Sequence, residues 1–204
     1  MHKINKVINT EKKGGVLQGK KILSIYYKHK PGGLCKRLYM MFDALAGAGA
    51  EVHYIAVEAY PISNPRIVPH LLWDPFNKKD GILFWAYFFL ISPFYIFIIA
   101  RREKIDMVSV FGAVYGFSAI FLKILLQTPI LIFVRADTVA IAQTLGHPQW
   151  RLSLEAQIVS IALRLSDRII AVNHPLKKIL SKRIKIDPDK ISVLHNNIEA
   201  HRKR

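Results

Sequence analysis

The sequence KILSIYYKHKPGG at residues 21–33 decides the fold. Its apolar first half predicts a short strand, which a basic loop and the turn Pro31-Gly32-Gly33 follow before a helical pattern begins. Strand, glycine turn and helix are the beginning of a βαβ unit. Because Gly32 and Gly33 have no Cβ atoms, and because a helix N-terminus attracts negative charge, the turn suits an anion or a sugar hydroxyl. A tight turn without a ligand is the alternative interpretation.

The rest of the chain alternates between short apolar segments and amphipathic ones. The alternation predicts an α/β fold, a Rossmann-like doubly wound and mainly parallel sheet. Predicted strands cover residues 51–57, 106–111, 130–134, 167–172 and 191–194. Predicted helices cover residues 34–49, 115–126, 151–165 and 174–183. The residues predicted to face the core are Leu34, Leu38, Met41 and Leu45 on the helix at 34–49, and Leu154, Ile158, Ile161 and Leu165 on the helix at 151–165.

Two segments between the second and third predicted strands stand apart. Residues 58–80 are predicted to be irregular because they contain four prolines, with Trp73 and Phe76 fixing the loop to the core or to a neighbouring surface. Residues 81–100 carry no charge and have the length of a membrane span. A span would place the flanking strands of one sheet on opposite sides of a bilayer, and Pro93 interrupts the helix. We therefore expect a core helix, or one that lies in the membrane interface.

Composition narrows the classes of partner. Hydrophobic residues make up 51% of the 204 positions, which excludes a disordered chain. Thirty Lys and Arg residues against 14 Asp and Glu residues give a net charge of +16, which favours nucleic acid, an anionic membrane or a phosphorylated small molecule. The single Cys35 excludes an internal disulfide and fits a cytoplasmic compartment. His53 and His70 are interpreted as solvated or core residues without a catalytic role, and no His or Cys cluster has the spacing of a metal site.

The polar candidates share one edge of the predicted sheet. In doubly wound sheets, ligands bind outside the carboxyl ends of the strands. The residues that follow these ends are His29 to Gly33, Gly112 to Gly116, Arg135 to Asp137, Asn173, His174, and His195 to Asn197. Arg135 can bind a diphosphate through two parallel hydrogen bonds. An ion pair between Arg135 and Asp137, or another neighbour, is the alternative.

A run of cations marks the last predicted helix. Lys177, Lys178, Lys182 and Arg183 have no acid among them, and the leucines and isoleucine beside them would let the helix rest on anionic lipid. A solvated helix face is the simpler interpretation of such a run. Nucleic acid is disfavoured as a partner because no recognised nucleic-acid motif accompanies the charge.

An ordered series of segments resembles a known family. PGG after the first strand is followed by LAGAGAEVHYIAV, DMVSVFG, IFVRAD, SDRIIAVNHPLKKIL and ISVLHNNI. This series, over residues 20–198, resembles the N-terminal half of family 4 glycosyltransferases, which have the GT-B fold. Many family members have histidine at the position of Arg135 and histidines at those of Ser109 and Phe111, so the chain departs from the pattern there.

The resemblance implies transfer of a sugar from a nucleotide sugar to an acceptor hydroxyl with retention of anomeric configuration. The nucleotide sugar is a donor substrate, and no tightly bound cofactor is expected. The donor-contacting residues are then Pro31, Gly32, Gly33, Gly112, Asn196 and Asn197, and the catalytic ones are Arg135, Asp137 and His174. Arg135 would assist the glycine loop at the diphosphate, while Asp137, His29 or His174 would orient the acceptor or take its proton.

The resemblance also sets the expected domain organisation. Residues 1–19 are predicted to be a flexible lead-in, residues 20–198 the acceptor-side domain, and residues 199–204 a basic tail where a donor domain would begin. We therefore expect an incomplete enzyme that is inactive alone and needs a separate C-terminal donor domain. Its expected acceptor is a glycan or a lipid-linked sugar, and its expected place is the cytoplasm, at the inner face of the plasma membrane. The alternative is a non-catalytic basic module that binds an anionic membrane or a partner chain.

Overall fold

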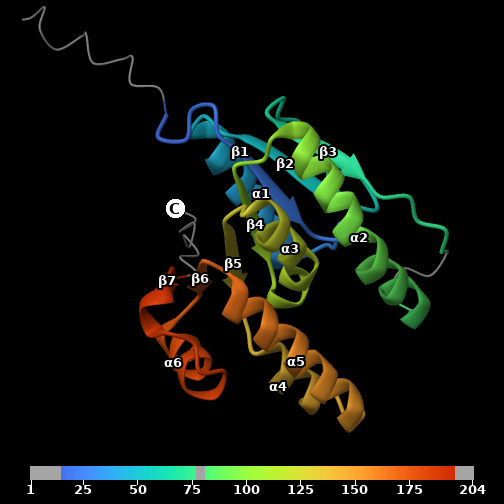
Figure 1. Cartoon of the computed structure of the whole chain (residues 1–204), viewed down its shortest axis with the longest axis vertical. Coiled ribbons are helices and arrows are strands. Elements are labelled where there is room, and N and C mark those ends of the chain that lie inside the picture. Colours follow the sequence, from blue (N-terminus) through green and yellow to red (C-terminus); the bar gives the residue numbers. More distant parts are fainter. Residues whose placement is uncertain (1–14, 77–80, 196–204) are drawn as a thin grey trace, which may run out of the picture.

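In the computed structural model, which describes residues 15–76 and 81–195, seven parallel strands form one sheet (Figure 1). Across the sheet they follow the order β3-β2-β1-β4-β5-β6-β7. Their bounds are β1 Lys21–Ile25, β2 Glu51–Ala56, β3 Ile67–Leu71, β4 Met107–Phe111, β5 Ile130–Val134, β6 Arg168–Ala171 and β7 Ile191–Val193. The interior strand β1 pairs Ile22 with Val52 on one side and with Met107 on the other. The predicted α/β class and parallel sheet are confirmed.

The helices lie in two layers around this sheet. They are α1 Gly33–Gly47, α2 Ile82–Glu103, α3 Ala113–Leu126, α4 Thr138–Thr144, α5 Gln149–Leu165 and α6 His174–Arg183, with a 3-10 turn at Pro188–Lys190. Helix α3 packs between α2 and α5, and Figure 1 shows the three in a row. Since crossovers between parallel strands are right-handed, α1 covers one face of the sheet and this row covers the other.

The central strands are hydrophobic almost throughout. In β1, β2 and β4 every residue after the first is buried. A sheet covered by helices on both faces needs apolar side chains on both, so these strands read as continuous runs and not as alternating patterns. The core continues into both helical layers, with Phe42 of α1 and Phe88 of α2 fully buried.

The segment predicted to be irregular contains strand β3. Pro69 lies inside it and faces Tyr54 of β2 in the register. Proline has no N–H group and cannot donate a hydrogen bond to a second neighbouring strand. Strand β3 tolerates Pro69 because β3 lies at one edge of the sheet and has only β2 as a neighbour. The predicted anchoring role is wrong for Trp73, which is 75% exposed, whereas Phe76 packs edge-on against Tyr87 with ring centroids 5.6 Å apart.

Two predicted inward stripes need correction. Helix α1 buries Cys35, Leu38, Phe42 and Ala46, and the predicted Leu34, Met41 and Leu45 lie half-buried at its rim. Helix α5 buries Leu152, Val159, Ala162 and Leu163, whereas the predicted Leu154, Ile161 and Leu165 are exposed and Ile158 is half-buried. Apolar residues occur on two sides of α5, and periodicity alone does not say which side meets the sheet.

Gly116 decides which side of α5 turns inward. It was grouped with the turn after β4, but it lies within α3. A Cβ atom at Gly116 would lie 2.6 Å from Ile132 Cδ1 and 3.3 Å from Ala162 Cβ. The missing side chain therefore allows α3 to lie close to both β5 and α5, and the small Ala162 is the α5 residue that fits against it.

Helix α2 is the long apolar helix predicted from residues 81–100. It continues through Pro93, so the predicted interruption is wrong. By length and composition it is the one helix of the described residues that could cross a membrane, a weak indication because core helices pass the same test; 33% of its apolar window is buried. It connects β3 to β4, which lie in the same sheet on either side of β2 and β1. A bilayer crossing by α2 would prevent that arrangement.

Candidate functional site

The site predicted at the carboxyl ends of the strands divides into two groups of residues. All described strands are parallel, so these ends share one edge of the sheet. The first group follows β1, β4 and β5 and contains Pro31, Gly32, Gly33, Gly112 and Arg135. The second follows β5, β6 and β7 and contains Asp137, Asn173, His174 and His195. Asn196 and Asn197, which were predicted to contact the donor, lie outside the described residues.

The first group surrounds the point where the winding of the sheet changes direction. There, α1 leaves β1 toward one face and α3 leaves β4 toward the other, the arrangement in which open α/β sheets generally form a ligand crevice between the two loops. Gly32 is the N-cap of α1 with φ 127°, and Gly112 is the N-cap of α3 with φ 115°. Neither residue has a side chain that could bond to the first-turn N–H groups. Both helices therefore direct N–H groups and a partial positive charge toward the crevice.

Arg135 adds a full positive charge to this group. Its Nε is buried and makes no hydrogen bond within the described part of the chain, and its guanidinium lies 5.9 Å from the centre of the Phe111 ring. Burial lowers the pKa of Arg135, and the positive charge of Arg37 on α1 lowers it further. Arginine remains charged at neutral pH even so. A partly buried cation with an unpaired N–H group has the chemistry that suits an anion, and the role of Arg135 at a diphosphate stays a prediction.

The ion pair considered for Arg135 forms elsewhere. Asp137 binds Arg183 through two hydrogen bonds, Nη1 to Oδ2 at 2.7 Å and Nη2 to Oδ1 at 3.1 Å. Asp137 is also the N-cap of α4 and accepts the N–H of Ala140 at 3.1 Å. Both carboxylate oxygens are engaged in joining α4 to α6. The catalytic role of Asp137 stays a prediction, and this geometry favours a structural role.

The remaining members of the second group lie near the surface. Asn173 is the N-cap of α6 and accepts the N–H of Leu176 at 2.8 Å. His174, the first residue of α6, is exposed, and its ring centroid lies 5.4 Å from that of His195. These two imidazoles are accessible to a ligand that enters along the edge. The role predicted for His174 remains a prediction.

The cationic run on α6 is only partly free. Lys177 Nζ donates to the carbonyl of Ile191 at 2.7 Å, and Arg183 is held by Asp137. Lys178 and Lys182 are exposed. Two of the four cations predicted to face a membrane therefore fix α6 to β7 and α4, which weakens the case for α6 as the lipid-binding surface.

Two contributors to the edge were not predicted. Arg37 lies four residues after Gly33 on α1, one turn along the same side of the helix, and the signal that could have identified it is a cation one turn beyond a glycine cap. Tyr39 lies 2.5 Å from Nδ1 of His29 through its hydroxyl, and the two rings are stacked with centroids 5.8 Å apart. Burial raises the pKa of Tyr39, so its phenol stays neutral. His29 is thereby fixed in orientation beside the glycine loop.

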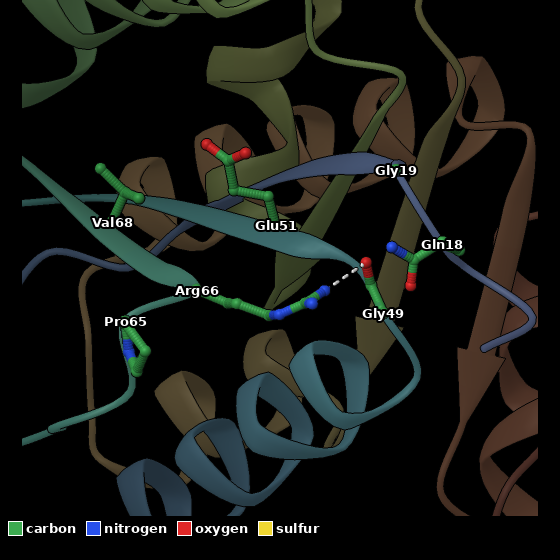
Figure 2. Close-up of a pocket in the computed structure, with 7 residues that line it drawn as sticks. All are labelled: Gln18, Gly19, Gly49, Glu51, Pro65, Arg66 and Val68. Carbon is green, nitrogen blue, oxygen red and sulfur yellow. Dashed lines mark hydrogen bonds between the residues drawn. The ribbon is translucent and has the colours of Figure 1, made fainter. Parts of the chain in front are cut away.

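A hollow at the opposite edge of the sheet is separate from this site. Figure 2 shows it between the amino-terminal ends of the first three strands, with Arg66 Nη1 bonded to the carbonyl of Gly49 at 2.9 Å. Its volume is about 470 Å³, and its lining residues are Gln18, Gly19, Gly49, Glu51, Pro65, Arg66 and Val68. Among residues 15–76 and 81–195, no group of three or more His, Cys, Asp or Glu residues is arranged to hold a metal ion.

Comparisons with known proteins agree with the fold and indicate a family. The profile of the family described as Glycosyltransferase Family 4 matches residues 31–202. Similar solved structures include sucrose-phosphate synthase from Thermosynechococcus elongatus, with 14% identity, a TM-score of 0.68, and coverage of 86% of this chain and 48% of that one. WaaG, a glycosyltransferase involved in lipopolysaccharide biosynthesis, has 12% identity and a TM-score of 0.58, with coverage of 85% and 44%.

A third solved structure, Anabaena HepE in complex with UDP and glucose, has 12% identity and a TM-score of 0.54, with coverage of 87% of this chain and 44% of that one. At such identities the likeness shows the fold. The chain spans about half the length of the solved structures it matches. No protein with a curated function matches it in sequence.

Proposed function

The chain belongs to glycosyltransferase family 4, and from this membership we propose that residues 15–195 form the acceptor-side half of an enzyme that transfers a sugar from a nucleotide sugar to an acceptor hydroxyl. The chain would form one wall of the cleft in which the donor and the acceptor meet. Transfer would then need a second, donor-binding domain, whether on the same polypeptide or on another.

One observation carries this proposal: Arg135 and the two glycine-capped helix N-termini follow β5, β1 and β4 at the same edge of the sheet. When a nucleotide sugar reacts, its glycosidic bond to the diphosphate breaks and negative charge accumulates on the leaving phosphate oxygens. Donors already directed at that charge stabilise the transition state without reorganisation. In this proposal Arg135 binds a phosphate oxygen through its guanidinium group, and the first-turn N–H groups after Gly32 and Gly112 bind others.

The acceptor would be positioned by the His29 and Tyr39 pair. In this proposal the neutral Tyr39 hydroxyl donates to Nδ1 of His29, and the ring proton of His29 then lies on Nε2. Nε2–H can then donate to an oxygen of a sugar acceptor beside the glycine loop. His174 offers a second exposed imidazole along the same edge for an extended acceptor. In this proposal the transfer retains the anomeric configuration.

The net charge of +16 supports a phosphate-bearing donor and an acceptor presented at an anionic surface. We infer a lipid-linked sugar or a growing surface glycan as the acceptor, and the cytoplasmic face of the membrane as the place of action. The same charge favours the second candidate function, a basic module that binds anionic lipid and has no catalytic role. Transfer activity separates the two candidates.

The test is a chimaera in which residues 15–195 replace the acceptor-side half of a characterised family 4 enzyme. We expect release of nucleoside diphosphate with one or more nucleotide sugars and lipid-linked acceptors, and no release by the 204-residue chain alone. Gly33→Val should abolish release, because a Cβ at Gly33 meets no protein atom within 4 Å but would lie where the diphosphate approaches. The control is Gly47→Ala at the far end of α1, where a Cβ also meets nothing. Release that survives both Gly33→Val and Arg135→Ala would refute the site, and a chimaera inactive with every donor would favour the non-catalytic module.

A further inference from the structure

Helix α2 presents an apolar stripe to the outside of the molecule. Leu83, Leu90, Phe94 and Ile98 are 71%, 66%, 66% and 56% exposed, and their spacing of seven, four and four residues places them on one side of the helix. With 1.5 Å of rise per residue, the stripe is roughly 22 Å long. The opposite side of α2 is buried against the sheet and α3. Four large apolar side chains in a row form a patch that soluble surfaces avoid unless it binds something.

The side-chain hydroxyls of Tyr87, Ser92 and Tyr95 on α2 are all hydrogen-bonded within the protein. The Tyr87 hydroxyl donates to the carbonyl of Trp73 at 2.5 Å, and the Tyr95 hydroxyl donates to that of Leu71 at 3.2 Å. Ser92 bonds to Ser118 of α3 within the core, with 3.0 Å between the two Oγ atoms. The stripe can therefore enter a medium without water and leave none of these side-chain hydroxyls unpaired.

Positive charge lies at one end of the stripe. Arg101, Arg102 and Lys104 are exposed where α2 ends, and the single acid among them, Glu103, is paired with Arg102 at 2.8 Å. The end of α3, which packs beside α2, adds the exposed apolar side chains of Phe121, Ile124 and Leu125. Since α2 and α3 each lead into a parallel strand, both helices end at the same edge of the sheet. Apolar side chains bordered by cations complement an anionic lipid surface.

We propose that the protein docks on an anionic bilayer through the outer side of α2, with Leu83, Leu90, Phe94 and Ile98 at the boundary between headgroups and acyl chains. A second copy of the chain is a poorer occupant, because two chains of charge +16 repel each other. In this pose the helix lies along the membrane and the carboxyl edge of the sheet opens sideways over the lipid surface. That edge could then receive a lipid-linked acceptor, a consequence that rests on the proposed function.

Flotation of the 204-residue chain with vesicles tests the pose without any transfer reaction. We expect binding to vesicles of phosphatidylcholine plus phosphatidylglycerol, weaker binding to phosphatidylcholine alone, and a loss of about tenfold or more on Leu90→Glu/Phe94→Glu. The matched control is Met40→Glu, at an exposed apolar position of α1 on the other face of the sheet. Charge reversal of Lys178 and Lys182 on α6 should change binding by less than about twofold. Unchanged binding by the α2 variant, or a larger loss from the α6 variant, would overturn the proposal.

A position-resolved measurement guards against misfolding of the charged variants. Cys35 is buried and free, so a Cys35→Ser background allows an environment-sensitive dye at Leu90→Cys or, as control, at Met40→Cys. On anionic vesicles we expect brighter, blue-shifted emission at position 90 and no change at position 40. Equal responses at both positions, or a vesicle-independent dimer that Leu90→Glu/Phe94→Glu dissociates, would show that α2 does not dock on lipid. Vesicle binding by a chimaera that transfers no sugar would refute the proposed function and leave the docking surface intact.

Discussion

Replacing Arg135 with methionine should leave the protein at least as stable as it is now while weakening its affinity for phosphate. Most substitutions of partly buried residues destabilise, so the sign of this effect is informative. Methionine keeps the aliphatic stem of arginine in place and removes the guanidinium, whose buried Nε has no hydrogen-bond partner in the described part of the chain. It also removes the repulsion from Arg37.

The magnitudes follow from these contacts. A buried polar group without a partner costs about 1–3 kcal/mol, and we take the low end because Arg135 is only half-buried. The attraction between the guanidinium and the Phe111 ring offsets about 0.5–1 kcal/mol of this gain. The free energy of unfolding should therefore rise by about 0–1 kcal/mol. One charge-assisted hydrogen bond contributes about 1.5–3 kcal/mol to binding, so the dissociation constant for pyrophosphate should rise roughly 10- to 150-fold.

Urea unfolding followed by circular dichroism gives the stability change, and titration calorimetry with pyrophosphate at low ionic strength gives the affinity. Arg151→Met, at an exposed cation at the start of α5, is the matched control, and neither of its values should change beyond error. A loss of more than about 1 kcal/mol on Arg135→Met would mean that the guanidinium has a structural partner, since an unpaired cation has none to lose. Unchanged pyrophosphate affinity would remove Arg135 from the site.

Asp137→Ala should lower the free energy of unfolding by about 1–2 kcal/mol, because both the α4 cap and the ion pair with Arg183 are lost. Asp137→Asn keeps the cap and should lower it by about half as much. Loss of transfer by the Asp137→Asn chimaera at unchanged stability would instead indicate a catalytic role for Asp137. Gly116→Leu should destabilise by about 2–3 kcal/mol because the new side chain meets β5 and α5, and urea unfolding no different from wild type would contradict that packing. Burial lowers the pKa of both His53 and His70, whose Nδ1 and Nε2 lie 2.8 Å apart, so the stability they confer is complete above their unfolded pKa of about 6.5 and is lost as the pH falls through the lower folded values. Urea unfolding between pH 7.5 and 5 should show this loss, and His53→Asn/His70→Asn should flatten it; an equal slope in the variant would assign the acid sensitivity to other groups.

The fold could be predicted from local sequence patterns because it repeats one unit, a strand followed by a helix. Each apolar run followed by an amphipathic run predicts a βα step, and the glycine turn at residues 31–33 identifies the first of them. Strand β3 escaped prediction because proline argues against a strand unless the strand lies at an edge, and edge position is a property of the whole sheet. The orientation of α5 escaped for the same reason, since Gly116 and Ala162 are matched in space and lie far apart in sequence.

The candidate site was predictable as an edge and not as a set of partners. Parallel topology brings Gly32, Gly112 and Arg135 to one side once the strands are assigned. Which charges neutralise each other is a different matter. Arg183 lies 46 residues from Asp137, and a run of cations on α6 carries no sign that one of them is already bound. Arg183 pairs with Asp137 and so leaves Arg135 without that partner, and only the packing of α6 against α4 reveals this pairing.

The position of β1 between β2 and β4 has a consequence for synthesis on the ribosome. The Lys21 amide is bonded to the Asp106 carboxylate, 85 positions later in the chain. At about 5–20 residues per second, roughly 4–17 s pass after β1 emerges before β4 can pair with it. During that time one edge of β1 is open and the whole of α2 emerges without its partners. The nascent chain is then most exposed to aggregation, and a chaperone would find its binding segments there.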